Sequence, residues 1–99
     1  MNVSYTLHDI NFEWDSSKAS ANLRKHGISF EKACEVFFDP FLYVENAGVV
    51  EGEQREAVVG MAVDWRLLYA VYVMRKDDVI RIISARPAIE AERRQYENQ

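Results

Sequence analysis

Residues 79–96 read VIRIISARPAIEAERRQY, and this stretch predicts one β-strand that leads directly into one helix. The apolar residues of its first half are mostly β-branched, which suits a buried pleated surface. Pro87 predicts the start of the helix, because its fixed φ fits the first helical position and its missing N–H is not needed there. Arg81 and Arg86 interrupt the apolar strand. Since a buried guanidinium is costly unless it is paired, each arginine is expected to have an internal carboxylate or an external phosphate as its partner.

The length and composition predict one small domain that folds without a metal or a disulfide. With 99 residues, 48% of them hydrophobic, the chain can bury a single core. Cys34 is the only cysteine, so an intramolecular disulfide is excluded and a buried hydrophobic role is expected for it. Residues 1–9 lack the features of a signal peptide, and no apolar run approaches the roughly 20 residues of a membrane span. A cytoplasmic protein is therefore expected.

The charges are unevenly placed along the chain. Residues 1–53 hold nine acidic and four basic side chains, whereas residues 54–99 hold seven acidic and eight basic ones. Lys76 is the only lysine of the second half, and the other cations there are arginines, which bind phosphate through a planar fork. A local basic surface is therefore compatible with the net charge of −4.

The N-terminal part predicts a tail, a strand and a helix. Met1–Asp9 has no clear periodicity and is interpreted as a mobile or weakly paired tail. Ile10–Trp14 alternates apolar and polar residues, as a half-buried strand does. Asp15 is the predicted N-cap of a helix over 16–25, which ends at Gly27.

A second helix is predicted after Ser29, its N-cap, and it ends at Asp39-Pro40. Its apolar residues recur with helical spacing, which is typical of a helix with one buried face. They are Phe30, Ala33, Cys34, Phe37 and Phe38.

From Phe41 onward the hydrophobic period is two, which predicts four strands joined by polar connectors. Strands are expected over 41–45, 55–63, 67–75 and from 79, with a loop or wide hairpin over 46–53 and turns over 64–66 and 76–78. Short connectors favour antiparallel pairing of neighbouring strands. The predicted fold class is therefore α+β: an N-terminal strand and two helices, an antiparallel four-strand meander and a C-terminal helix, with the helices on one face of the sheet.

Lys25 and His26 are the first candidate site residues. Histidine titrates near neutral pH and can transfer protons, and lysine can hold a phosphate. Both also lie at the end of the first predicted helix, where cations are favoured by the helix dipole. A purely structural role is the alternative for this pair.

Trp65 and Arg66 lie in a predicted turn, where surface contact with a ligand or a partner is plausible. Tryptophan can stack on a nucleic-acid base. Trp14 alternates with apolar residues, so packing in the core is expected for it instead.

The arginines are the third group of candidates. In a regular strand Arg81 and Arg86 point to opposite faces, so they share a surface only if the strand twists or ends. Arg55, at the start of another strand, converges with them only if the sheet brings it there. Ion pairs with Glu13 or Glu92 are the structural alternative to phosphate binding. The sequence shows no metal-ligand spacing and no phosphate-binding glycine loop.

Three blocks of sequence are informative in combination. They are Phe12-Glu13-Trp14-Asp15 with Lys18, Asn22, Lys25-His26-Gly27 and Phe30; Phe37 with Asp39-Pro40; and Arg81-Ile82-Ile83-Ser84-Ala85-Arg86 with Ala88, Glu92, Arg93 and Tyr96. In this order they resemble the BrnT family of ribonuclease toxins from bacterial type II toxin–antitoxin modules, which have a RelE-like fold. The resemblance extends from Phe12 to Tyr96, and Arg55 and Gly60 also fit it.

The resemblance implies an endoribonuclease that halts translation and has no metal or other cofactor. It also implies neutralisation by a BrnA-like antitoxin with a ribbon–helix–helix domain, through which alone the toxin would contact DNA. Family members commonly carry proline where this chain has Ser16. They also commonly carry lysine and threonine where it has Pro87 and Ile89, so RNA binding here is expected to be weaker or differently placed.

The corresponding mechanism is attack of the ribose 2′-OH on the adjacent phosphorus, with cations stabilising the developing charge. Arg81 and Arg86 are expected to stabilise the phosphate, and Lys25 and His26 to bind it or transfer protons. Arg55, Trp65 and Arg66 are expected to bind RNA, and Glu13 is either a base or the partner of an arginine. The competing hypothesis is a non-catalytic protein that acts only as partner and co-repressor of a DNA-binding antitoxin. A role as a DNA-binding regulator itself is weak, because no basic recognition helix is predicted.

Overall fold

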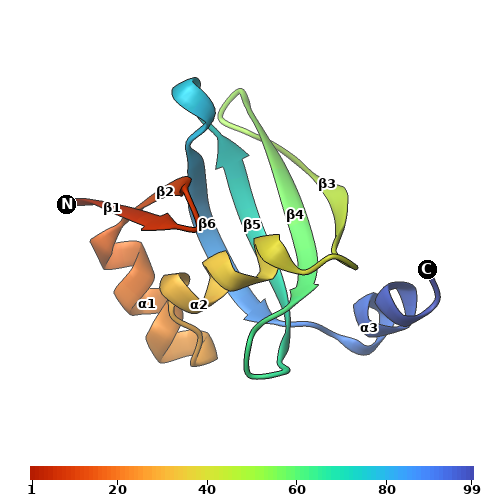
Figure 1. Cartoon of the computed structure of the whole chain (residues 1–99). Helices are drawn as coiled ribbons and strands as arrows, with labels where there is room; N and C mark the ends of the chain where they lie inside the picture. Colours follow the sequence, from red (N-terminus) through yellow and green to blue (C-terminus); the bar gives the residue numbers. More distant parts are fainter.

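The computed structural model describes residues 1–99 and shows the α+β class expected from the sequence. Figure 1 shows a curved sheet with α2 and the short η1 helix lying across one face, α1 beside that sheet and α3 beyond its opposite side. The prediction that the helices lie on one face of the sheet is therefore wrong for α3. The elements in chain order are β1 (Asn2–Leu7), β2 (Ile10–Asp15), α1 (Ser16–His26), α2 (Phe30–Glu35), η1 (Val36–Phe38), β3 (Tyr43–Val50), β4 (Glu53–Met61), β5 (Leu67–Met74), η2 (Lys76–Asp78), β6 (Ile80–Pro87) and α3 (Glu90–Glu97).

The six strands form one mixed sheet in the order β1-β2-β6-β5-β4-β3. Strands β3 to β6 are an antiparallel meander, as predicted. The N-terminal β2 joins the meander in parallel, but only through two residue pairs, Phe12↔Ile80 and Glu13↔Arg81. Most of the outer edge of β6 is therefore left without a neighbouring strand.

The first two helices form for the local reasons that the sequence predicts. The Asp15 carboxylate accepts a hydrogen bond from Lys18 N at 3.1 Å, and Gly27 ends α1 in the left-handed conformation with φ 70°. Ser29 caps α2 by accepting from Lys32 N at 3.1 Å. The predicted second helix tightens into the 3₁₀ turn η1 for its last residues.

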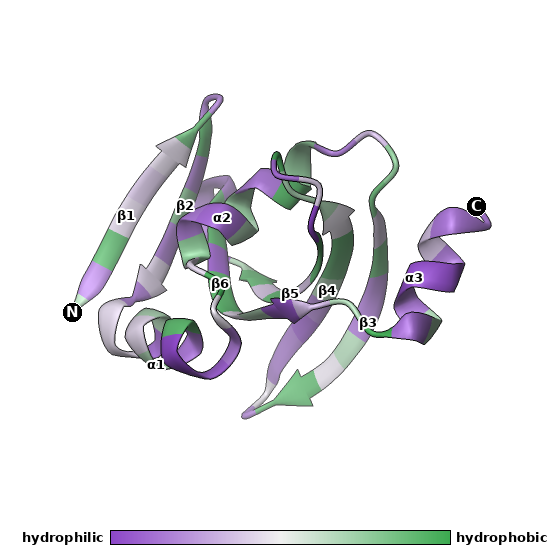
Figure 2. Ribbon diagram, turned by 90° about the horizontal axis from the view of Figure 1, so that it is seen from below, coloured by the Kyte–Doolittle hydropathy of each residue, from purple (hydrophilic) through white to green (hydrophobic).

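The core lies between α2–η1 and one face of the sheet. Phe12, Trp14, Phe30 and Ile82 are at most 2% exposed, and Cys34 is fully buried, so the core roles predicted for Trp14 and Cys34 are confirmed. Figure 2 shows hydrophobic colour along much of β4 and both colours on α2, whereas α3 is largely hydrophilic. Because α3 has no buried residue, it is attached to the domain mainly by polar contacts.

The prediction of a mobile or weakly paired tail underestimated the order of this segment. Residues 2–7 form β1, which pairs antiparallel with β2 over its whole length. Alternate side chains of β1 (Val3, Tyr5 and Leu7) pack against the core, and the Tyr5 and Trp14 rings lie 5.6 Å apart. Polar and apolar residues alternate over Asn2–Leu7, as expected for an edge strand with one exposed face, and this signal was missed in the sequence.

Of the two alternatives predicted over 46–53, a loop or a wide hairpin, the structure shows a hairpin, but its turn is tight. Strand β3 continues to Val50, and only Glu51 and Gly52, with φ 53° and 76°, form the turn. The extra glycine, Gly48, lies within β3 at an irregularity in the pairing between Asn46 and Val49. A glycine at a bulge was therefore interpreted as part of a loop.

Pro87 does not start the last helix, which corrects the prediction. It is the final residue of β6, opposite Leu68, and the next residue still pairs with β5 because Ala88 N donates to Leu67 O at 2.9 Å. The helix α3 begins at Glu90, and the Glu92 carboxylate accepts from Ile89 N at 2.9 Å at its start. Proline is tolerated in β6 because it lies at the strand end.

Candidate functional site

Arg81 and Arg86 lie on the same face of the sheet. The pairing of β5 with β6 shifts between Val71↔Ser84 and Tyr72↔Ile82, which leaves Ile83 as one extra residue in β6. Such a bulge reverses the alternation of side chains beyond it. The two arginines, five positions apart, are thereby placed on the face opposite the core, across from Val73 and Tyr69. We call this surface the arginine face; it consists of Arg55, Ala57, Val59, Tyr69, Val71, Val73, Arg81, Ser84 and Arg86.

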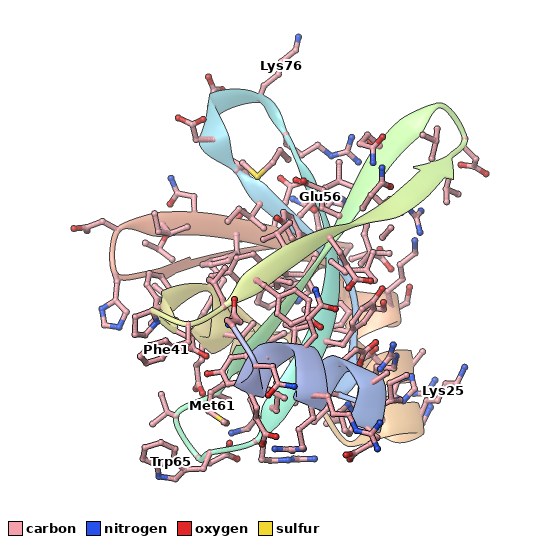
Figure 3. All side chains as sticks on the ribbon, turned by 90° about the vertical axis from the view of Figure 1, so that its right-hand side faces the viewer. Lys25, Phe41, Glu56, Met61, Trp65 and Lys76 are labelled. Atoms are coloured by element: carbon pink, nitrogen blue, oxygen red, sulfur yellow. The ribbon has the colours of Figure 1, made fainter.

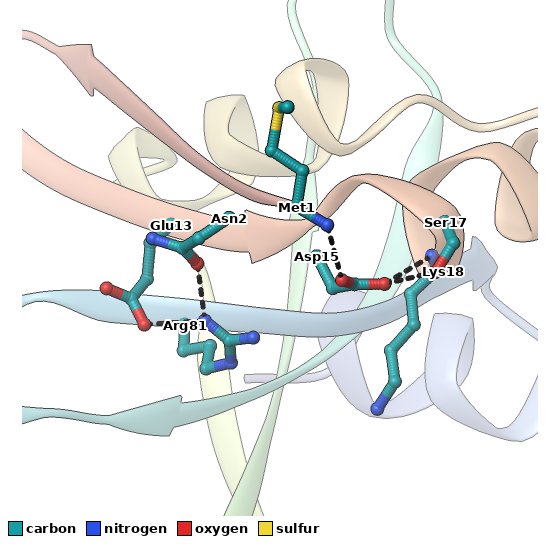
Figure 4. A network of polar contacts seen from close by, with 7 residues as sticks. All are labelled: Met1, Asn2, Glu13, Asp15, Ser17, Lys18 and Arg81. Carbon is teal, nitrogen blue, oxygen red and sulfur yellow. Dashed lines mark hydrogen bonds and ion pairs between the residues drawn. The ribbon is translucent and has the colours of Figure 1, made fainter.

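Arg81 is paired with a carboxylate inside the domain. Its Nη1 donates to Glu13 Oε2 at 2.6 Å and to Asn2 Oδ1 at 2.9 Å, and Figure 4 shows the three side chains meeting across β1, β2 and β6. Both members of the ion pair are about one quarter exposed. The Nε and Nη2 groups of Arg81 make no hydrogen bond within the chain and remain available as donors.

Arg86 is held by the C-terminal helix. Its Nη1 and Nη2 donate to the two oxygens of Glu92 at 2.9 and 2.8 Å, and its guanidinium lies 4.0 Å from the centre of the Tyr69 ring. The hydrogen bond to Glu92 raises the pKa of Arg86. Burial alone would raise the pKa of Glu92, but the hydrogen bonds from Arg86 and from Ile89 N and the charge of Arg86 outweigh it, so the pKa is lowered.

Arg55 has no carboxylate partner. It shares the arginine face with Ala57, which pairs with Val71 on the neighbouring strand. Its Nε is buried and makes no hydrogen bond. Since unpaired buried polar groups are uncommon, this guanidinium is the best candidate on the face for binding an anion directly.

The helix α1 lies along the unpaired edge of β6 and is fixed there by Asn22. The Asn22 side-chain amide, 7% exposed, donates to Ala85 O at 2.8 Å and to Ile28 O at 2.9 Å, and accepts from Ala85 N at 3.0 Å. It therefore satisfies the backbone groups that a neighbouring strand would otherwise pair. The sequence interpretation gave Asn22 no role, although a polar residue on the buried side of an amphipathic helix was an available signal.

Beside Asn22, α1 and β6 form an open pocket of about 230 Å³ with a cationic rim. Lys18, Lys25 and His26 line it from the helix, and Ile83 and Ser84 line it from the bulged strand. Neither lysine side chain has an acidic partner in the structure. The pocket borders the part of β6 that runs between Arg81 and Arg86, although neither arginine lines it. We call this region, with Lys18, Lys25, His26, Ser84, Arg81 and Arg86, the β6 site.

Trp65 and Arg66 do not join the β6 site. They lie in the turn between β4 and β5, where Trp65 is 83% exposed. Figure 3 shows Lys25 and Trp65 on opposite sides of the molecule. The structure therefore separates Trp65 and Arg66 from the other candidate site residues. Those are Lys25, His26, Arg55, Arg81 and Arg86.

The β6 site can hold a phosphate between cations and place a histidine beside it. Guanidinium and ammonium groups stabilise the charge on phosphate oxygens, and an imidazole can give or accept a proton near neutral pH. Glu13, considered as a base from the sequence, is instead paired with Arg81.

The structure contains no helix with the length and hydrophobicity of a membrane span.

The fold and the site define a small α+β domain that presents cations around a cavity suited to an anionic ligand. Residues 14–92 match the model of the family described as the ribonuclease toxin, BrnT, of type II toxin–antitoxin systems, and the chain belongs to this family. The resemblance seen in the sequence is thereby confirmed.

The fold is also similar to that of a solved structure, the 1.1 Å crystal structure of the Brucella abortus ribonuclease toxin BrnT. The TM-score is 0.53 with 18% sequence identity, and the match covers 78% of this chain and 94% of the other. A comparison with curated protein sequences found no match.

Proposed function

We propose that this protein is an endoribonuclease toxin that cleaves RNA at the β6 site without a metal ion and so inhibits translation. The observation that supports the proposal is that Lys25 and His26 line one pocket with Ser84, a residue of β6 between Arg81 and Arg86, which share one face of the sheet. Family membership supplies the ribonuclease activity as an expectation, and the residue roles are our proposal.

The proposed reaction uses the substrate's own hydroxyl as nucleophile. The ribose 2′-OH attacks the adjacent phosphorus, its proton passes to a base, and the bond to the 5′-oxygen breaks as that oxygen gains a proton. The products are a 2′,3′-cyclic phosphate and a 5′-OH end. His26 is proposed for proton transfer and Lys25 for binding the phosphate, with Arg81 and Arg86 stabilising the charge that develops on its oxygens. Arg55 is proposed to bind a neighbouring phosphate of the RNA.

The resting structure sets a condition on this mechanism, because both arginines already have carboxylate partners. Arg81 can still donate Nε and Nη2 to a phosphate while its Nη1 remains on Glu13. Arg86 uses both N–H groups of Nη1, for Glu92 and Pro87 O, and one of Nη2 for Glu92, so only Nε and one Nη2 N–H are free unless the pair opens. Arg81 is therefore expected to contribute more than Arg86 to transition-state stabilisation.

The test is cleavage of a short RNA by the purified protein in EDTA, with the product ends mapped. His26→Ala and Lys25→Ala are expected to lower kcat/KM at least tenfold. Their matched controls are His8→Ala, which changes the other histidine, and Lys76→Ala, which changes an unpaired lysine at the far end of the molecule (Figure 3). Full activity in folded His26→Ala and Arg81→Ala proteins, or activity only with added metal, would contradict the proposal.

The partner is proposed to be a ribbon–helix–helix antitoxin, through which the complex would contact DNA. The family places the protein in a toxin–antitoxin system, and the type of antitoxin is our inference. Operator DNA is expected to be bound by the complex and not by the toxin alone. Binding of operator DNA by the isolated toxin would contradict this.

The second candidate function is a non-catalytic partner and co-repressor of the antitoxin. It is favoured by the ion pairs Arg81–Glu13 and Arg86–Glu92, which give both arginines a structural role. Induced expression without the antitoxin separates the two functions. Growth arrest with new 5′ ends on cellular RNA supports the enzyme, whereas neither effect from a folded, accumulated protein supports the co-repressor.

A further inference from the structure

Exposed apolar side chains gather around a pocket on the side of the molecule away from the β6 site. The pocket holds about 240 Å³ and lies between η1 and the end of β4. Val63 and Trp65 on its rim are 79% and 83% exposed, and the neighbouring Phe41 is 67% exposed. Figure 3 shows Phe41, Met61 and Trp65 on this one side, opposite Lys25. We call this surface the Trp65 patch: Phe38, Pro40, Phe41, Met61, Val63 and Trp65.

The backbone conformation of Trp65 indicates that the fold does not require a tryptophan at this position. Its φ is 67°, in the left-handed region that glycine and asparagine adopt readily and a bulky residue adopts at a cost. The turn is closed by backbone hydrogen bonds between Ala62 and Trp65 and between Ala62 and Arg66, at 3.0 and 2.8 Å, which need no particular side chain. A tryptophan that is strained and exposed is explained by contact with a partner.

The charge of the pocket identifies the kind of partner. Two carboxylates, Glu35 and Asp39, line it, and no lysine or arginine does. The Asp39 oxygens accept from Phe41 N at 2.9 Å and from Met61 N at 2.7 Å, and Glu35 Oε1 accepts from Val63 N at 3.0 Å. The second oxygen of Glu35 has no partner within the chain. An RNA phosphate would be repelled here, whereas an apolar side chain next to a lysine or arginine of a protein would fit.

We infer that the Trp65 patch is the docking surface of the antitoxin, which inserts an apolar side chain into the pocket and places a basic side chain against Glu35. The inference rests on the proposed function for the identity of the partner, but it does not depend on RNA cleavage. Trp65 is thus reassigned from RNA binding to protein binding.

The test measures binding of the purified antitoxin encoded in the same operon to the full-length toxin by calorimetry. Trp65→Gly removes the side chain and suits the backbone, so this variant is expected to melt no lower than the wild type. Its Kd for the antitoxin is expected to rise at least tenfold. Glu35→Gln keeps an oxygen for Val63 N and removes the charge, and its Kd is expected to rise at least threefold, with a weaker dependence on salt.

Val49→Ser is the matched control, because Val49 is 63% exposed on the β3–β4 hairpin, away from the patch. Its Kd is expected to stay within twofold of the wild type. Antitoxin binding within twofold of the wild type in Trp65→Gly would overturn the inference, as would RNA binding that Trp65→Gly weakens while antitoxin binding is kept. A wild-type toxin that fails to bind the antitoxin would overturn it together with the proposed partner. A toxin that binds antitoxin but cleaves no RNA would remove only the proposed enzyme.

Discussion

The side-chain amide of Asn22 makes with the backbone of Ala85 the two hydrogen bonds that a neighbouring strand would make. It donates to the carbonyl of Ala85 at 2.8 Å and accepts from its N–H at 3.0 Å, across 63 residues of sequence. Because β2 pairs with β6 only at its beginning, this contact fixes α1 to the rest of that strand. The position of Lys25 and His26 beside Ser84 therefore depends on one amide group.

Asn22→Ala is expected to destabilise the protein by about 2–4 kcal/mol, since it leaves several buried backbone groups without partners. Chemical denaturation with an unchanged m-value would measure the loss. Ser20→Ala, at an exposed position of the same helix, is the control and is expected to change little. A loss below about 0.5 kcal/mol in Asn22→Ala would show that water replaces the amide.

Glu92→Gln is expected to loosen α3 more than the rest of the domain. The variant keeps an oxygen for Ile89 N but loses the charged, two-pronged contact with Arg86, in which Glu92 is only 11% exposed. We expect a loss of about 1–3 kcal/mol and faster amide exchange over residues 90–97. Glu90→Gln, whose pair with Arg94 is largely exposed, is the control. Equal exchange rates in the two variants would contradict a special role for the Arg86–Glu92 pair.

The docking of α3 is expected to weaken in acid. The pKa values of Glu92 and Asp39 lie below their ordinary values of 4.5 and 3.8, despite burial, because of the hydrogen bonds both carboxylates accept. A carboxylate whose pKa is lower in the folded state than in the unfolded state stabilises the folded protein at pH values above the unfolded-state pKa. This stabilisation is lost as the pH falls through the folded-state pKa. The melting temperature should therefore begin to fall below about pH 4.5. Glu92→Gln should show a shallower fall, and the same slope in both proteins would contradict the assignment.

Gly60→Ala is expected to destabilise the contact between β4 and η1. A Cβ at this position would lie 2.7 Å from the Val36 carbonyl oxygen and 3.1 Å from Val36 Cβ, so the backbone must move. The expected loss is about 1–3 kcal/mol, measured by chemical denaturation. The substitution leaves the φ of the residue in the ordinary range, so a near-neutral result would mean that η1 shifts freely.

Much of the fold could be predicted from local sequence features. The caps at Asp15 and Gly27 fixed the bounds of α1, and the period of two predicted the antiparallel meander with close bounds for β4, β5 and β6, whereas β3 is longer than predicted. The internal partners considered for the arginines, Glu13 and Glu92, are the ones the structure shows. Each of these inferences depended on neighbouring residues or on the cost of burying a charge.

The sequence by itself determined the fold class, the first two helices, the antiparallel meander and the family, because these follow from the order and spacing of side chains. Only the tertiary structure decided that Arg81 and Arg86 share a face, since the bulge at Ile83 exists through pairing with β5. It also decided that residues 2–7 form a strand and that Pro87 ends one. Strand register and the faces of a sheet are set by partners distant in sequence, and a one-residue shift reverses every side chain beyond it.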